Sequence, residues 1–188
     1  MTVEIIPADH FSTQDLTDLY NQTRVDYLVP MPMNADRLNE YIHDYDVDLH
    51  HSCVARHADG QVLGLSMLGF RHQTAWITRL GVLPVTRRTG AGSVLMHSML
   101  ANAAALGAKE IHLEVIKNNA PAYNLFLKTG FIEKDTYLVM RHAPRPMTMP
   151  LQDEVTWLNF DKALEKLETY PHHLTWINAL ESMRNSPN

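Results

Sequence analysis

The stretch Arg87-Arg88-Thr89-Gly90-Ala91-Gly92 separates a strand-like apolar run, which ends at Pro84, from a helix-prone run between Ser93 and Leu106. Pro84 ends the first run because proline donates no hydrogen bond to a neighbouring strand. The two glycines accept backbone conformations with positive φ and let a ligand approach the main chain closely. The free amides and the dipole at the start of the helix then favour an anion at this turn.

This turn lies in a positive segment of an acidic protein. Between Arg71 and Gly92 there are four arginines and no acidic residue, whereas the whole chain carries a formal net charge of −5. The contrast favours a phosphate-bearing ligand over nucleic acid. A P-loop is excluded because no Gly-Lys-Ser/Thr follows, and a dinucleotide fingerprint is excluded because Leu95 replaces its third glycine. An ordinary connection between a strand and a helix remains the alternative.

A second informative segment follows the helix. Residues 109–116 alternate between apolar and polar side chains, as a strand does. Asn118 or Asn119 then offers a helix N-cap, Pro121 suits the first turn, and Gly130 suits a left-handed helix end. The sequence therefore predicts a strand followed by a helix.

Both segments resemble the GCN5-related N-acetyltransferase (GNAT) family. Arg87-x-x-Gly90-x-Gly92 is similar to the family's pyrophosphate loop. The family's second motif, in the form found in ribosomal-protein N-terminal acetyltransferases, resembles Leu113-Glu114-Val115 followed by Asn119-x-x-Ala122-x-x-Leu125-Phe126-x-x-x-Gly130-Phe131. The resemblance implies an α/β (α+β) fold with a mixed, mostly antiparallel central sheet, splayed between its fourth and fifth strands and flanked by helices.

The same resemblance implies an N-acetyltransferase that moves an acetyl group from acetyl-CoA to a primary amine of a small molecule, peptide or protein, by direct attack in a ternary complex. The alternative is a catalytically weak sensor or assembly module that binds coenzyme A or acetyl-CoA. By resemblance, main-chain groups of the fourth strand bind the pantetheine arm, and the loop with its two arginines binds the pyrophosphate. The expected cofactor-binding residues are Leu80, Gly81, Val82, Arg87, Arg88, Thr89, Gly90, Ala91, Gly92, Ser93, Asn119, Ala122 and Phe126.

Glu114 is the candidate general base, because it occupies the glutamate position of the second motif. The alternative is a cross-strand partner for Arg79. Phe126 stands where the family usually has the tyrosine that protonates the leaving thiolate, and phenylalanine has no proton to give. Tyr123 lies three residues earlier on nearly the same helical face and is the candidate acid, with solvent as the alternative. Phe126 favours the weak binding module, whereas Glu114 and the intact loop favour the enzyme.

The N-terminal part predicts a strand over residues 2–6, a helix from the Ser12 cap to about Arg24, and a helix from the Asn34 cap to about Tyr45. In the family, these two helices and their connection form a wall of the acceptor pocket. The resemblance therefore assigns substrate contacts to Tyr27, Met31, Met33 and Tyr41. Packing in the core is the alternative for these four side chains.

The middle of the chain predicts a hairpin of residues 52–56 and 61–70, and a further strand over residues 74–82. Residues 137–141 are expected to form the last strand of the domain. The acidic run of residues 44–48 predicts a solvated turn, since it lacks the glycine and glutamate of a calcium loop. Eleven histidines form no ligand pattern, and no metal site is expected.

Length and composition indicate how large a core the chain can form and in which compartment it is expected. With 188 residues and 45% apolar content, the chain can bury one sizeable core. It contains no apolar run long enough for a membrane span, which takes about 18 residues, and no secretion signal is recognised at its start. Cys53, the one cysteine, fits a reducing compartment and is expected to be a buried, inert thiol. We therefore expect a cytoplasmic protein without membrane or nucleic-acid partners.

A change in composition predicts the domain boundary. Pro144, Pro146 and Pro150 mark a linker, so that residues 1–142 form the GNAT domain and residues 143–188 form the linker and C-terminal helices. Residues 157–170 and 173–184 are expected to be helical. They are expected to pack on the domain or on a second copy of the chain, which would make a homodimer. They also resemble the connector of acetyltransferases that continue into a second, degenerate copy of the domain.

Overall fold

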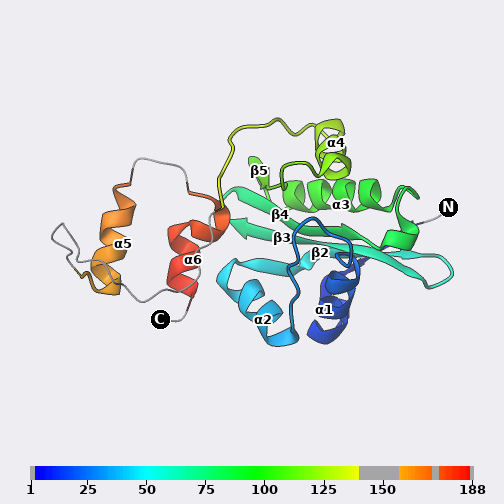
Figure 1. The fold of residues 1–188 in the computed structure, drawn as a ribbon, viewed down its shortest axis with the longest axis horizontal. Helices are drawn as coiled ribbons and strands as arrows, with labels where there is room; N and C mark the ends of the chain where they lie inside the picture. The colour runs from blue at the N-terminus through cyan, green and yellow to red at the C-terminus, as the bar shows by residue number, and fades with distance from the viewer. Residues whose placement is uncertain (1–2, 140–156, 171–173, 187–188) are drawn as a thin grey trace. The chain divides into compact units, whose positions relative to one another are not determined.

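The computed structural model describes residues 3–139, 157–170 and 174–186 (Figure 1). The chain divides into two compact units, one made of residues 1–131 with 174–188 and the other of residues 132–173. In the second unit, the helix α5 (Phe160–Glu168) begins after Asn159, whose side chain accepts a hydrogen bond from the Lys162 amide. The elements described below belong to the first unit.

A five-stranded sheet forms the centre of the first unit. Its strands follow one another in space in chain order, and only the last pair, β4 with β5, is parallel. The strands are β1 (Val3–Pro7), β2 (Val47–His57), β3 (Val62–Arg71), β4 (Thr74–Val82) and β5 (Glu110–Leu113). The mixed, mostly antiparallel sheet that the sequence predicts is therefore confirmed.

Helices cover both faces of this sheet. In Figure 1, α3 and α4 lie on one side of it, and α1 and α2 lie on the other. The helices are α1 (Thr13–Gln22), α2 (Ala35–Asp44), α3 (Ala91–Ala105), α4 (Ala120–Lys128) and α6 (Leu180–Asn185). Three short 3-10 helices are η1 (Ala8–His10), η2 (Pro84–Thr86) and η3 (Trp176–Asn178).

Each helical layer has its own hydrophobic core. Leu95, Met96 and Met99 of α3 are fully buried against one face of the sheet. Leu16 of α1 and Leu38 of α2 are fully buried against the other face. Burial of a side chain of this size stabilises the fold by about 1.5–3 kcal/mol, so both layers contribute strongly.

The local signals in the sequence form as expected. Ser12 and Asp15 make a capping box at the start of α1. The Asn34 side chain accepts from the Arg37 amide at the start of α2, and Asn119 caps α4. These helix starts are therefore predictions that the structure confirms.

The predicted splay between β4 and β5 is also present. The two strands pair only between Thr74–Ile77 and Glu110–Leu113. Beyond Ile77, β4 continues to Val82 and stays paired with β3 alone. The strand β5 ends at Leu113, where β4 diverges from it, and is therefore shorter than the predicted strand of residues 109–116.

Two predictions about local structure need correction. The turn predicted over residues 44–48 forms at residues 45–46 only and is not solvated, because Val47 is buried and begins β2, and Asp46 binds the buried Arg71. Residues 137–139 form no strand, and the described sheet consists of β1–β5. Residues 140–141 of the predicted strand lie outside the described residues.

Residues 174–186 pack against the core of the first unit. The Trp176 ring stacks on Trp76 with 5.6 Å between ring centroids, and its Nε1 donates to the Tyr45 carbonyl at 2.9 Å. The predicted boundary between residues 142 and 143 lies outside the described residues, so that division stays a prediction, as does the homodimer. In the described part of the chain, none of the helices combines the length and the apolar character needed to cross a membrane.

Candidate active site

The loop before α3 presents main-chain amides at a helix N-terminus. Gly90 is the N-cap residue with φ of 93°, and a Cβ there would meet open space. Its carbonyl accepts from the amides of Ser93 and Val94. No described side chain caps α3, and the first amides of a helix have no acceptor within the helix. The amides of residues 91 and 92 are therefore available to an anion.

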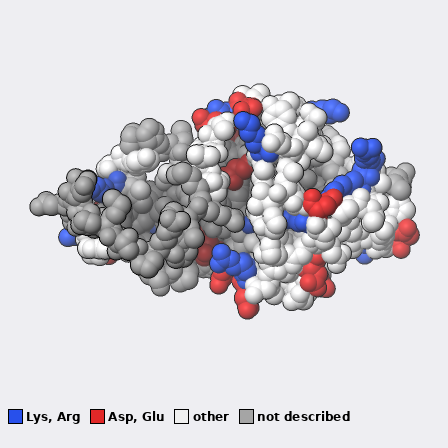
Figure 2. Space-filling model, viewed as in Figure 1, with Lys and Arg blue, Asp and Glu red and all other residues white. Residues whose placement is uncertain are grey.

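Arg87, predicted to bind pyrophosphate, is engaged within the protein. Its guanidinium forms two hydrogen bonds with the Asp26 carboxylate, at 2.6 and 2.7 Å, and also donates to the carbonyls of Thr23 and Val82. The hydrogen bond with Asp26 raises the pKa of Arg87 and lowers that of the carboxyl. Arg88 is exposed. In Figure 2, basic side chains gather at the right of the view, over the segment leading into α3, with acidic side chains beside them.

The end of β4 packs closely on the end of α1. A Cβ on Gly81 would lie 2.8 Å from the Thr23 Cβ, so only glycine allows this approach. Leu80 and Val82 point to the opposite face, where they pack against the core under α3. Because β5 has diverged, the main-chain groups of residues 80–82 on the edge toward β5 have no strand partner in the described sheet.

Glu114 lies on the α1–α2 face of the sheet, one residue after β5. His112, two residues earlier, is opposite Trp76, whose side chain is in the core under α1 and α2. Although Glu114 is exposed, desolvation by the surrounding protein raises the pKa of its carboxyl, and the positive charge of Arg79 lowers it. The predicted base and the alternative partner are therefore close enough to interact electrostatically.

Two arginines and three tyrosines lie together on this face, and we call them the arginine–tyrosine cluster. The Arg79 guanidinium lies 4.1 Å from the Tyr41 ring centroid and donates to Tyr20 Oη at 2.9 Å. The Arg24 guanidinium lies 4.3 Å from the Tyr20 ring centroid and 5.1 Å from that of Tyr27. Glu114 lies near the cluster, since its charge acts on Tyr41 and the charge of Arg79 acts on it.

A bulge in β4 directs Arg79 into this cluster. The pairing of β3 with β4 shifts in register between Leu65 and Met67, and Arg79 has φ of 54°. An extra residue in one strand turns its side chain away from the regular alternation. Just before the bulge, Thr78 Oγ1 and Tyr41 Oη form a 2.6 Å hydrogen bond. Burial raises the pKa of Tyr41 to about 12, so this hydroxyl stays neutral.

The predicted substrate contacts divide into two groups. Tyr27 and Tyr41 belong to the cluster, and the Met31 carbonyl accepts from Tyr20 Oη at 3.0 Å. Met33 instead exchanges main-chain hydrogen bonds with the Asn21 side chain and packs against the core. A pocket of about 270 Å³ opens beside the cluster and is lined by Asn21, Arg24, Val25, Pro30, Met31 and Pro32.

Phe126 and Tyr123, the candidate acid, both lie on α4 but differ in exposure, so the expectation that they share nearly the same environment on one helical face is not met. Phe126 is 8% exposed and packs in the core against Phe131 and Ala122. Tyr123 is 37% exposed on the surface of the helix. The Asn119 side chain, besides capping α4, donates to Tyr27 Oη at 3.4 Å and so links this helix to the connection between α1 and α2.

Sequence reasoning did not assign Tyr20 and Arg24 to the site, and it left the side of Arg79 open. Tyr20 carries the spacing of a core residue in α1, and Arg24 follows the last turn of that helix. The bulge that turns Arg79 has no signature in the residues themselves. The signals in the sequence that point to this region are the resemblance, which assigns Tyr27 and Tyr41 to the substrate, and for Arg79 the count of arginines in a segment without acids.

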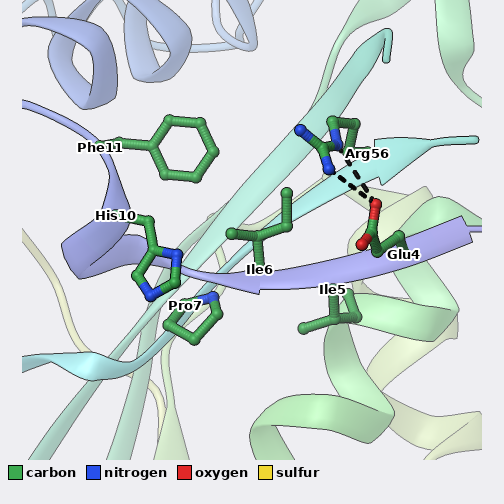
Figure 3. Close-up of a pocket in the computed structure, with 7 residues that line it drawn as sticks. All are labelled: Glu4, Ile5, Ile6, Pro7, His10, Phe11 and Arg56. Carbon is green, nitrogen blue, oxygen red and sulfur yellow. Dashed lines mark hydrogen bonds and ion pairs between the residues drawn. The ribbon is translucent and has the colours of Figure 1, made fainter. Parts of the chain in front are cut away.

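A pocket of about 430 Å³ lies away from all predicted site residues (Figure 3). Its lining comes from β1, η1 and β2: Glu4, Ile5, Ile6, Pro7, His10, Phe11 and Arg56. Within the described ranges, no group of histidine, cysteine or carboxylate side chains could hold a metal ion. Cys53 is buried, and desolvation raises the pKa of its thiol, as expected for an inert thiol.

Comparison with known proteins gives relatives over part of the chain. An uncharacterised N-acetyltransferase of Mycobacterium tuberculosis is 39% identical over 79 residues, which cover 42% of this chain and 50% of the relative. An N-alpha-acetyltransferase of Sulfurisphaera tokodaii is 35% identical over 97 residues, covering 45% of this chain and 56% of the relative. The chain therefore spans about half the length of the curated relatives it matches.

Solved structures share the fold. Ard1 from Thermoplasma volcanium superposes with a TM-score of 0.60 at 21% identity, covering 72% of this chain and 86% of that one. The PaiA N-acetyltransferase from Thermoplasma acidophilum, in complex with coenzyme A, gives a TM-score of 0.58 at 20% identity, covering 73% and 94%.

The Acetyltransferase (GNAT) family matches residues 14–131. This span begins in α1 and includes the Gly90 loop, the splayed end of β4, Glu114 and α4. Because the match covers more than half of the sequence and the fold agrees with it, the chain belongs to the acetyltransferase (GNAT) family.

Proposed function

We propose that the protein is an acyl-CoA-dependent N-acetyltransferase that acetylates a primary amine. The observation that carries the proposal is the divergence of β4 from β5 beside the Gly90-capped N-terminus of α3. This arrangement combines a free strand edge with an anion-binding helix start. The two features suit an elongated ligand that has an amide-containing arm and a phosphate group.

The residues present fit acetyl-CoA, which supplies the acetyl group as a thioester. Gly90 and Gly92 keep side chains out of the loop, and the amides of residues 91 and 92 would hold the pyrophosphate together with Arg88. Arg87 supports the loop through its ion pair with Asp26. The main chain of residues 80–82 would bind the amide-containing arm.

Glu114 is the proposed general base. A desolvated carboxylate with a raised pKa accepts a proton more readily than an ordinary one, which suits removal of a proton from an ammonium group. Tyr123, exposed on α4, or solvent would return a proton to the thiolate. Phe126 favours the second candidate, a weakly catalytic coenzyme A sensor, because its buried ring has no proton to give. The single buried cysteine supports a cytoplasmic location.

Titration calorimetry with acetyl-CoA, followed by thiol release with amine acceptors, tests this function. We expect binding by the wild type and loss of binding, at least 100-fold, in Gly92→Trp. Gly92→Ala is the matched control, because a Cβ there would make ordinary 3.5 Å contacts with Leu125 and Val82. Thermal unfolding checks that both variants fold. Wild-type affinity in folded Gly92→Trp would remove the loop assignment, and binding without release on any acceptor would favour the sensor.

A further inference from the structure

The arginine–tyrosine cluster carries more positive than negative charge. Arg24 and Arg79 contribute two cations, and Glu114 is the acid whose charge acts on Arg79. Tyr41 adds no negative charge at neutral pH, since burial raises the pKa of its hydroxyl to about 12. Asp26, on the same connection as Tyr27, is occupied by Arg87. One positive charge is therefore left without a counterion in the described surroundings of the cluster.

Both guanidinium groups also have hydrogen-bonding capacity to spare. Arg24 Nη1 donates to Thr23 Oγ1 at 3.1 Å, and Arg79 Nη1 donates to Tyr20 Oη at 2.9 Å. The Nε atoms of both arginines are buried and have no acceptor among the described residues. An arginine has five N–H donors, and buried donors are normally paired. These two side chains are held in place, by rings and single hydrogen bonds, without the acceptors that would satisfy them.

The cluster is also costly for the protein to maintain. Burial lowers the pKa of Arg24, and the nearby positive charge of Arg79 lowers it further. Like charges in a partly desolvated site repel one another unless an anion lies between them. The pocket of about 270 Å³ is lined by Arg24 and so gives an anion access to one of the two side chains, while Arg79 lies beside the same Tyr20 ring within the cluster.

We propose that the acceptor amine of this protein carries an anionic group, a carboxylate or a phosphate, that binds between Arg24 and Arg79. The inference rests on the proposed function, because it names the substrate class of that same site. Two guanidinium groups recognise planar or tetrahedral oxyanions through paired hydrogen bonds. The amine of such an acceptor lies toward Glu114, which is on the same face of the sheet.

This arrangement also bears on the protonation of the acceptor. An amine attacks only in its neutral form, and the excess positive charge of the cluster lowers the pKa of an ammonium group bound nearby. The same charge repels acceptors that carry several ammonium groups. A small zwitterion is therefore favoured over a polyamine, since its anionic group compensates the cluster while its amine faces the base.

Matched acceptor pairs test the inference. The panel is L-phenylalanine with its amide, β-alanine with its amide, phosphoethanolamine with ethanolamine, and spermidine, with kcat/KM for thiol release as the readout. We expect the anionic member to exceed its uncharged partner by at least tenfold. A preference confined to the amino acids indicates a carboxylate, and one confined to phosphoethanolamine indicates a phosphate. Equal rates within pairs, or a preference for spermidine, would overturn the inference.

Variants connect the preference to the cluster. Arg24→Gln and Arg79→Gln should each reduce the preference at least fivefold, mainly through KM, whereas Arg37→Gln, which removes an exposed pair with Glu40 on α2, should leave it unchanged. Arg79→Lys keeps the positive charge and should retain part of the preference for anionic acceptors that Arg79→Gln loses. If no acceptor reacts, binding of the acetylated products to the CoA-loaded protein is measured by calorimetry instead. The products are N-acetyl-L-phenylalanine, N-acetyl-β-alanine and N-acetylphosphoethanolamine, each beside its uncharged counterpart. Equal affinities within every pair overturn the inference. Failure to bind acetyl-CoA would instead contradict the proposed function.

Discussion

The molecule contains two arginine sites of opposite character. Arg71, at the end of β3, is 9% exposed and has acceptors around its whole guanidinium. Its Nε binds Asp46 at 2.6 Å, Nη1 donates to the Trp176 carbonyl at 3.2 Å, and Nη2 donates to Ser182 Oγ at 2.8 Å. Arg24 and Arg79 lie among aromatic rings with buried donors that have no described acceptor.

The difference separates structural from functional charge. A buried cation that is fully paired ties segments together, and here residues 174–186 are joined to β3 and to the end of α2. A cation whose pairing is incomplete stabilises the folded state little and has capacity left for a ligand. Removing each arginine in turn should therefore move different measurements.

The largest expected effect is on stability at Arg71. Arg71→Met should lower the free energy of unfolding by about 3 kcal/mol, because it removes the buried guanidinium that pairs with Asp46 and donates to Ser182 and the Trp176 carbonyl. Urea unfolding of the full chain measures this. Acetyl-CoA affinity of the folded variant should stay at the wild-type value. An unfolding free energy within 1 kcal/mol of the wild type would contradict the structural role of this site.

The next effect is on turnover at Glu114, beside the unpaired cluster. Glu114→Gln should lower kcat by about 10²-fold with little change in acetyl-CoA affinity, because the base is lost and the loop is intact. Glu110→Gln, at the start of β5 and paired with His112, is the matched control and should keep the wild-type rate. Wild-type turnover in Glu114→Gln would return this residue to a structural role.

The dependence of kcat/KM on pH gives a second test of Glu114 as the general base. Because the pKa of Glu114 is raised in the folded protein, kcat/KM should fall as pH drops below that raised value, and Glu114→Gln should remove this acid limb. The free energy of unfolding depends on pH in the opposite direction. Because the folded state favours the protonated carboxyl of Glu114, the contribution of this group to stability is full at pH values below the ordinary pKa of a glutamate and is lost as pH rises through the raised pKa.

These two sites also show what the sequence can predict. Local patterns determine the elements: the Ser12–Asp15 capping box, the strand of residues 74–82 and the Asn119 cap all form as predicted. The splay was predicted through the family motifs on either side of it. Such features depend on neighbours in sequence or on motif spacing, and for that reason they can be read without a structure.

The arginine sites depend on contacts that local patterns do not encode. Arg71 meets Trp176 across 105 residues, and the acidic run of residues 44–48 supplies Asp46 to that contact. The direction of Arg79 depends on a single bulge in the pairing with β3. A shift of one residue in register exchanges the faces of a strand, so composition alone could not decide the side on which this arginine lies.

The smallest expected effect is on stability at Arg79, and it decides the comparison. Arg79→Gln loses one hydrogen bond to Tyr20 but also removes a buried unpaired donor and the repulsion of Arg24, so the free energy of unfolding should change by less than about 1 kcal/mol. Urea unfolding beside Arg71→Met measures the contrast. In the same variant the acid limb of kcat/KM should move to higher pH, because the positive charge that lowers the pKa of Glu114 is gone. A loss of stability as large as that of Arg71→Met would make the cluster a second structural site, and the reason to expect an anionic acceptor would then disappear.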